Sequence, residues 1–137
     1  MTGDEIIAKV NEQNFPEGSY IIFGSCPMAI LGIRESNDID MLVSEELHKE
    51  LKEKGWKKII KSPKDHPLTF DVFEAHDHWN FSSYNPTLEE LLSRAIEVKG
   101  VMFASIEDVK KWKASSGRDK DFIDIDLIDS YLKGKVG

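Results

Sequence analysis

Hydrophobic residues recur along this chain at helical spacing in some segments and in short, strand-like runs in others. Leu88, Leu91 and Leu92 fall on one face of a helix over 87–95, and Thr87 with Glu90 supplies the residues of an N-terminal capping box. The apolar run 20–23 ends at a Gly-Ser pair and is typical of a strand. Further helices are predicted near the N-terminus and over 26–33, 45–54, 105–115 and 119–132, and further strands over 38–43, 56–60, 68–73 and 96–104, the last interrupted at Gly100.

Helices and strands alternate for most of the length. This order predicts an α/β (α+β) fold in which a single mixed β-sheet is flanked by helices. The chain has 137 residues, a length that fits one domain, and it contains no Pro-, Gly- or Ser-rich stretch that would act as a linker. We therefore expect a single domain over 1–137.

The composition indicates the cellular compartment in which the chain acts. The single cysteine, Cys26, excludes an internal disulfide and favours a reducing compartment. The N-terminal residues lack the basic region of a secretory signal, and no apolar run approaches the roughly 20 residues that cross a membrane. We expect a soluble, cytoplasmic protein that does not contact a membrane.

The charge balance is acidic, with 18 Lys and Arg residues against 25 Asp and Glu residues and a formal net charge of −7. A net acidic chain is a poor candidate for indiscriminate nucleic-acid binding, which needs cations to displace counterions from phosphates. A local basic patch is still compatible with this balance. The basic stretch formed by Lys57, Lys58, Lys61 and Lys64 either solvates a hairpin or receives an anionic acceptor such as RNA.

Two carboxylates give the strongest chemical signal. Asp38 and Asp40 stand at i and i+2 in a predicted strand, so their side chains project from the same face. Adjacent carboxylates repel each other in a partly buried site unless a cation lies between them, and Mg²⁺ is bound by one or two carboxylates together with substrate phosphates. The pair is therefore a metal-site candidate. The alternative is that both acids belong to a solvated turn that begins at Ser36-Asn37.

Gly24 and Ser25 lie between a predicted strand and a predicted helix. Backbone N–H groups at a helix N-terminus bind phosphate well, and Gly24 lacks a Cβ that would block close approach. In isolation, an ordinary tight turn with Ser25 as the helix N-cap explains the pair equally well. Next to a candidate metal pair, however, the two residues indicate a phosphate site.

A third carboxylate would complete a site for two metal ions. Asp71 stands in the otherwise apolar segment LTFDVFE, where burial of an unpaired carboxylate would cost several kcal/mol. An acid in such a strand either faces solvent at an edge or is compensated by a metal, and we favour the metal. Glu74 is the alternative third ligand.

Two weaker patterns, a second D-I-D string and a group of histidines, have ordinary structural explanations. Asp124 and Asp126 repeat the D-I-D string, but they lie in a predicted helix, where positions i and i+2 do not share a face. We do not assign them as a metal pair. His66, His76 and His78 could bind a transition metal, although an exposed loop is the favoured interpretation.

Two segments together resemble a known family. The segment GSCPMAILGIRESNDIDMLV, residues 24–43, is similar to the Gly-Ser, short helix, [D/E]-h-[D/E]-h signature of the polymerase-β-like nucleotidyltransferases. The segment KASSGRDKDFIDIDLI, residues 113–128, is similar to the K-x4-R-x-K-D-x2-D helix pair of small prokaryotic members, which include relatives of the abortive-infection toxins. The ordered pair of motifs spans nearly the whole chain and is more specific than either motif alone.

The resemblance implies a nucleotidyltransferase fold and a metal-dependent reaction. A nucleoside monophosphate would pass from an NTP to an acceptor hydroxyl, with release of pyrophosphate. Gly24 and Ser25 would hold the nucleotide phosphates, and Lys113 would reach the triphosphate.

The same resemblance implies the metal ligands. Asp38 and Asp40 would bind two Mg²⁺ ions, with Mn²⁺ as a substitute. Asp71 would be the third catalytic carboxylate, bridging to activate the acceptor hydroxyl.

The acceptor is left open and could be RNA, a protein or a small molecule. Ser25 is followed by Cys26-Pro27 instead of the small residue and Arg common in the minimal antibiotic-modifying members, and 137 residues leave little room for acceptor recognition. The alternative is a non-catalytic nucleotide-binding or toxin–antitoxin interaction module on the same scaffold. Either function could involve a partner protein or a homo-oligomer.

Overall fold

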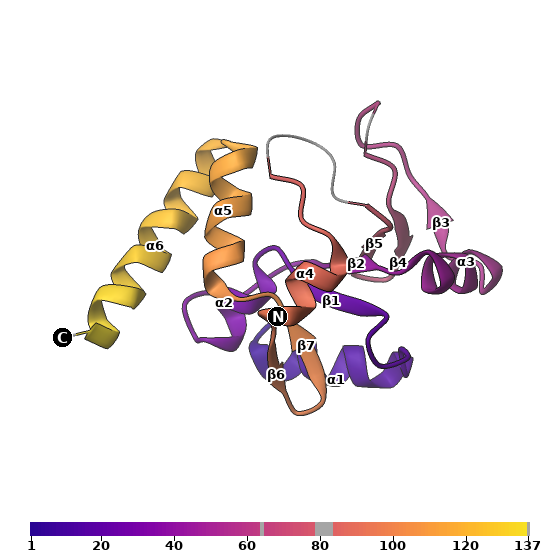
Figure 1. Ribbon diagram of the computed structural model, residues 1–137, viewed down its shortest axis with the longest axis horizontal. Helices are drawn as coiled ribbons and strands as arrows, with labels where there is room; N and C mark the ends of the chain where they lie inside the picture. The colour runs from indigo at the N-terminus through magenta and orange to yellow at the C-terminus, as the bar shows by residue number, and fades with distance from the viewer. Residues whose placement is uncertain (64, 79–83, 137) are drawn as a thin grey trace.

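The structure is a computed structural model that describes residues 1–63, 65–78 and 84–136 (Figure 1). Lys64 of the predicted basic stretch lies outside these residues. Among the helices of the described part, none is both long and apolar enough to span a bilayer. In chain order the elements are α1 (Gly3–Gln13), β1 (Tyr20–Phe23), α2 (Cys26–Ile30), β2 (Ile39–Val43), α3 (Glu45–Glu53), β3 (Lys57–Lys58), β4 (Leu68–Phe70), β5 (Phe73–His76), α4 (Leu88–Ser93), β6 (Ile96–Val98), β7 (Val101–Phe103), α5 (Ile106–Ser116) and α6 (Asp119–Val136).

A seven-stranded sheet forms the centre of the molecule, with the strand order β3-β4-β5-β2-β1-β7-β6. The pairs β2–β5 and β1–β7 are parallel, whereas the other neighbours are antiparallel. The predicted α/β (α+β) fold, a single mixed sheet flanked by helices, is therefore confirmed.

The sheet buries apolar side chains on both faces. Ile39 and Met41 of β2 belong to a core shared with α1 and α3, while Leu42 belongs to a second core shared with α4, α5 and α6. Because side chains alternate along a strand, Asp38 and Asp40 lie on the same face as Leu42. That face is the one covered by α5 and α6, which stand side by side at one end of the molecule in Figure 1.

Local sequence signals set the helix ends. The capping box predicted at Thr87 and Glu90 is present at the start of α4, and Thr2 with Glu5 forms another at the start of α1. Each box satisfies backbone N–H groups that have no partner within the first helical turn. Gly117 ends α5 in the left-handed conformation, with φ of 66°, and lets the chain reverse into α6.

The single strand predicted over 68–73 is wrong, and the difference matters for the site. The segment forms two strands, β4 and β5, which pair antiparallel across the turn at 71–72, with Phe70 opposite Phe73. Asp71 begins this turn with φ of 51°, a left-handed conformation that few non-glycine residues adopt. The segment 96–104, predicted as a strand interrupted at Gly100, divides there into β6 and β7, with Lys99 and Gly100 between them.

Candidate active site

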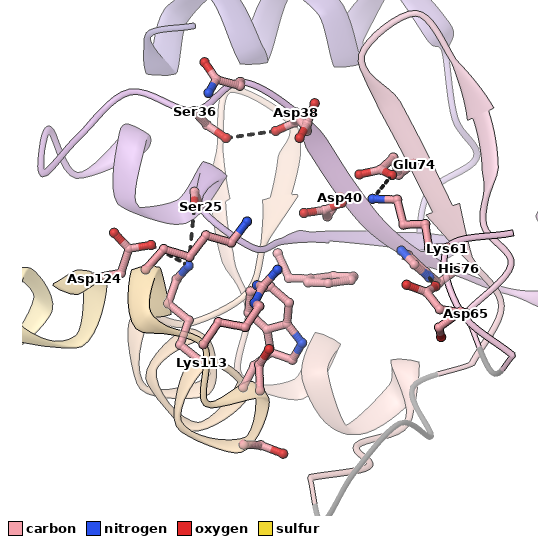
Figure 2. A pocket seen from close by; sticks show the side chains of 18 of the residues that line it. Ser25, Ser36, Asp38, Asp40, Lys61, Asp65, Glu74, His76, Lys113 and Asp124 are labelled. Carbon is pink, nitrogen blue, oxygen red and sulfur yellow. Dashed lines mark hydrogen bonds and ion pairs between the residues drawn. The ribbon is translucent and has the colours of Figure 1, made fainter. Parts of the chain in front are cut away.

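A pocket of about 780 Å³ lies between strands β2 and β5, the turn after β1, and helices α5 and α6 (Figure 2). Its walls carry opposite charges. The strand side presents carboxylates, whereas the helix hairpin presents cations. The carboxylates are Asp38, Asp40 and Glu74, and the cations are Lys113, Arg118 and Lys120.

The carboxylate side is built by two neighbouring parallel strands. Asp40 of β2 is the register partner of Glu74 of β5, and both side chains reach the pocket. Asp38 precedes β2 by one residue, is exposed, and lines the same pocket. The prediction that Asp38 and Asp40 share a face is therefore confirmed, and the structure adds Glu74 to them.

Asp71 is not brought to this site. Its carboxylate lies in the β4–β5 turn, 49% exposed, and accepts a hydrogen bond from Lys9 of α1 at 2.9 Å. Because the turn separates Asp71 from β5, the carboxylate beside Asp40 comes from Glu74, the alternative third acid. The alternation in Phe73-Glu74-Ala75-His76, buried apolar residues against polar ones, is the sequence signal that would have placed Glu74 on the pocket face.

Gly24 makes room for the Asp40 carboxylate. Its backbone has φ of +72°, and a Cβ at this position would lie 2.6 Å from Asp40 Oδ2. No real Cβ approaches an oxygen so closely. The glycine predicted to admit a phosphate therefore also admits the carboxylate of the neighbouring strand.

Ser25 does not cap α2. Its hydroxyl makes no capping hydrogen bond and instead accepts one from Lys113 Nζ at 3.3 Å. Lys113 is only 2% exposed, and its ammonium also donates to Asp124 Oδ2 at 2.8 Å. The helix hairpin therefore holds the turn after β1 through a buried lysine.

The carboxylates around Lys113 form a buried ion network. Asp124 also accepts from Arg34 Nη1 at 2.7 Å, and Asp121 accepts from Arg118 Nε at 2.8 Å. Burial alone would raise the pKa of each carboxyl, but the hydrogen bonds from these cations lower both pKa values overall. Asp124 is buried and Asp126 is exposed, so the second D-I-D string does not present two carboxylates on one face.

Lys61 completes the carboxylate side. Its ammonium forms an ion pair with Glu74 Oε1, next to Asp40 (Figure 2). Burial and the hydrogen bond with Glu74 raise the pKa of Asp40 well above its usual value. Burial opposes ionisation of Glu74 as well, yet the hydrogen bonds from Lys61 and Asp40 lower the pKa of Glu74. A proton is therefore held more readily by Asp40 than by Glu74, and the Lys61 ammonium offsets part of the negative charge of the pair.

Cys26 is fully buried and contacts the backbone of Asp38. Its thiol donates to the Asp38 carbonyl oxygen at 3.1 Å, and burial raises the pKa of the thiol to about 12. A buried thiol with so high a pKa is a poor nucleophile at neutral pH. Its hydrogen bond helps to hold the backbone from which the Asp38 side chain projects.

The donor groups fit Mg²⁺ better than a transition metal. Within the described residues, no group of three or more His, Cys, Asp and Glu side chains is arranged to hold a metal ion. The histidine cluster is not assembled, because buried His76 pairs with Asp65 instead. Asp40 and Glu74 offer two adjacent carboxylates, which suits Mg²⁺ because this ion takes one or two carboxylates and completes its shell with water and substrate phosphates.

The architecture is that of nucleotidyltransferases. Two solved structures of ANT(2″)-Ia match it over most of the chain. A crystal structure of ANT(2″)-Ia in complex with adenylyl-2″-tobramycin has a TM-score of 0.50 and 16% identity, covering 93% of this chain and 85% of that one. The solution structure of this antibiotic-resistance factor has a TM-score of 0.52 and 18% identity, covering 94% and 81%. At this identity the likeness establishes the fold, and the predicted nucleotidyltransferase fold is confirmed.

Comparison of sequences adds nothing to this likeness. No protein-family model matches the chain, and no curated protein matches it.

Proposed function

We propose that this protein is a metal-dependent nucleotidyltransferase that moves a nucleoside monophosphate from an NTP to an acceptor hydroxyl and releases pyrophosphate. One observation carries the proposal: the paired carboxylates of Asp40 and Glu74 line one pocket together with Ser25, next to Gly24, and the opposite side of that pocket carries Lys113, Arg118 and Lys120. The nucleotidyltransferase fold supports the same conclusion.

Each wall of the pocket has a role in this reaction. The backbone at Gly24 and Ser25 binds the nucleotide phosphates, and buried Lys113 acts through Ser25, whose hydroxyl it orients. Arg118 and Lys120 lie nearer to solvent and contribute positive charge toward the triphosphate. Phosphoryl transfer needs little from a protein beyond positioning and neutralisation of charge, and this arrangement supplies both.

Asp40 and Glu74 would hold Mg²⁺, or Mn²⁺ in its place, and Asp38 lines the same pocket. Such an ion neutralises the developing charge on the phosphate and leaving-group oxygens. Glu74 takes the place predicted for Asp71. The hydrogen bonds from Lys61 and Asp40 lower the pKa of Glu74, which favours the ionised carboxylate that a metal ligand needs.

The acceptor is proposed to be a small molecule with a free hydroxyl. The ligand of the ANT(2″)-Ia crystal structure, adenylyl-2″-tobramycin, is the product expected from nucleotidyl transfer to a small molecule. RNA and protein acceptors are the outcomes that the transfer assay below distinguishes.

A second function is favoured by one specific observation. No three metal-binding side chains converge within the described residues, as an assembled site for two metal ions would require. A nucleotide-binding or toxin–antitoxin interaction module without turnover would have this geometry. A nucleotide-binding module would share NTP binding with the enzyme and lack transfer, whereas a toxin–antitoxin interaction module would show neither.

Thermal stability with each NTP, measured with and without Mg²⁺, tests the site. A ligand at roughly 100 times its dissociation constant stabilises a protein by about 2.7 kcal/mol, so the melting temperature should rise only when both NTP and Mg²⁺ are present. Glu74→Gln should abolish the rise. The matched control Asp71→Asn should keep it, because Asp71 pairs with Lys9 away from the pocket. A rise that survives in Glu74→Gln and disappears in Asp71→Asn would reverse the assignment.

Transfer itself is measured with NTP labelled at the α-phosphate. The protein is incubated with separated RNA, protein and small-molecule fractions of a cell extract, and the label in each fraction is counted. We expect label in the small-molecule fraction and at least about a 100-fold loss with Asp40→Asn, since metal-bound carboxylates contribute several kcal/mol to such reactions. Magnesium-dependent NTP binding without transfer to any fraction would favour the nucleotide-binding module, and the absence of NTP binding would favour the interaction module.

A further inference from the structure

Lys61 occupies the position of a cation at the carboxylate pair. It follows β3, and its backbone N–H donates to the Asp65 carbonyl oxygen at 2.9 Å, so the start of its side chain is fixed. From there the side chain crosses into the pocket and its ammonium pairs with Glu74 beside Asp40 (Figure 2). The two carboxylates of adjacent strands are therefore neutralised in part by a lysine.

This ion pair can open without disturbing the fold. The Lys61 side chain is 44% exposed, whereas the Glu74 side chain is only 12% exposed. Glu74 is held in β5 between β2 and β4, but Lys61 reaches it along a flexible four-carbon chain from an exposed loop. Withdrawal of the ammonium into solvent would leave both carboxylates in place and uncover Glu74.

An ammonium and a divalent cation compete electrostatically at Glu74. Lys61 pairs with Glu74 Oε1, and a metal ion bound by Asp40 and Glu74 would lie within a few ångströms of that ammonium. A charge of 2+ at such a distance repels the ammonium at the moderate dielectric of a pocket wall, so binding of one cation weakens binding of the other.

We propose that Lys61 is a displaceable counter-ion that competes with the divalent metal for Glu74. This inference rests on the proposed function, because it assumes that Asp40 and Glu74 are metal ligands. In the metal-free protein Lys61 keeps the paired carboxylates close together. When metal binds, the ammonium leaves Glu74 and becomes available to an anionic group of the substrates in the same pocket.

Titration of Mn²⁺ into the metal-free protein without nucleotide tests this competition, with free Mn²⁺ followed by electron paramagnetic resonance. Lys61→Gln removes the competing charge and should lower the dissociation constant for Mn²⁺ by about three- to fivefold, the upper part of the range expected for loss of a partly exposed ion pair. Lys58→Gln is the matched control. It makes the same change of charge on the exposed strand β3, outside the pocket lining, and should leave the constant within about twofold of wild type.

The outcomes separate this inference from the proposed function. Mn²⁺ binding by Lys61→Gln that is equal to or weaker than that of wild type would overturn the role of Lys61 and leave the metal-site assignment intact. A gain in affinity that is equal in Lys58→Gln and Lys61→Gln would have the same consequence. Mn²⁺ binding that is absent from both wild type and Lys61→Gln, or that persists unchanged in Asp40→Asn, would overturn the metal site and the Lys61 role together. Melting curves of each metal-free variant establish that it is folded before titration.

Discussion

Replacement of Lys113 by methionine tests the buried ion network that links the helix hairpin to the site. The Lys113 side chain is 3% exposed and lies 2.8 Å from Asp124 Oδ2 and 3.9 Å from Asp121 Oδ1. Loss of one partner from a buried ion pair typically costs about 3–5 kcal/mol, because the remaining charge stays buried without compensation. Here Arg34 and Arg118 still neutralise part of the charge of the two carboxylates.

We therefore expect Lys113→Met to lower the free energy of unfolding by about 2–3 kcal/mol, below the full cost of an uncompensated charge. Urea denaturation at pH 7 measures the change. Lys110→Met is the control, since Lys110 also links α5 to α6 through Asp129 but both side chains are about 40% exposed, and such a pair contributes at most about 1 kcal/mol.

A double-mutant cycle identifies the cause. If buried, unpaired charge is responsible, Asp124→Asn in the Lys113→Met background should recover part of the lost stability. The reasoning is refuted if Lys113→Met costs no more than Lys110→Met, or if the effects of Lys113→Met and Asp124→Asn simply add.

Two further predictions concern the carboxylate side. Gly24→Ala should destabilise the protein by about 1–2 kcal/mol, the cost of a left-handed non-glycine residue. It should also abolish stabilisation by NTP and Mg²⁺, because the new Cβ displaces the Asp40 carboxylate. An unchanged melting temperature and nucleotide response would contradict this prediction. Asp40 has a raised pKa in the folded, metal-free protein, so its contribution to stability is fully present below its unfolded-state pKa, near 3.8, and is lost as pH rises through the raised value. Asp40→Asn should therefore flatten the loss of stability between weakly acidic and alkaline pH, as measured by melting temperature in the presence of a chelator, and an unaltered pH profile would argue against the raised pKa.

The sequence predicted well those features that depend on neighbouring residues. The capping box at Thr87 needs only Thr and Glu three positions apart, and the alternation around Asp40 needs only a strand. The turn at Asp71 was missed because its one local signal is Asp71 itself, a residue type that tolerates the left-handed conformation, inside an otherwise apolar run. The pairing of Asp71 with Lys9, 62 positions earlier, is a tertiary contact that local patterns do not show.

Local sequence patterns could not predict the partners of Lys61 and Lys113 either. Lys113 was predicted to reach the triphosphate, but its burial depends on Asp124, which approaches it only after the hairpin at Gly117 has closed. Lys61 was one member of a basic stretch, and its pairing with Glu74 depends on the register of β4 and β5. The sequence thus indicated which residue types form the site, but the contacts of Lys61 and Lys113 depend on tertiary packing.

The bond from Lys113 to Ser25 joins positions 88 apart, and the one from Arg34 to Asp124 joins positions 90 apart. During synthesis the turn after β1 and the strands β2 and β5 emerge from the ribosome before the helix hairpin that contacts them. Chains fold from the N-terminus as they are made, at about 5–20 residues per second. In chain order the last strand, β7, ends at Phe103, so the sheet is completed late, and the pocket forms only after α5 and α6 have been made.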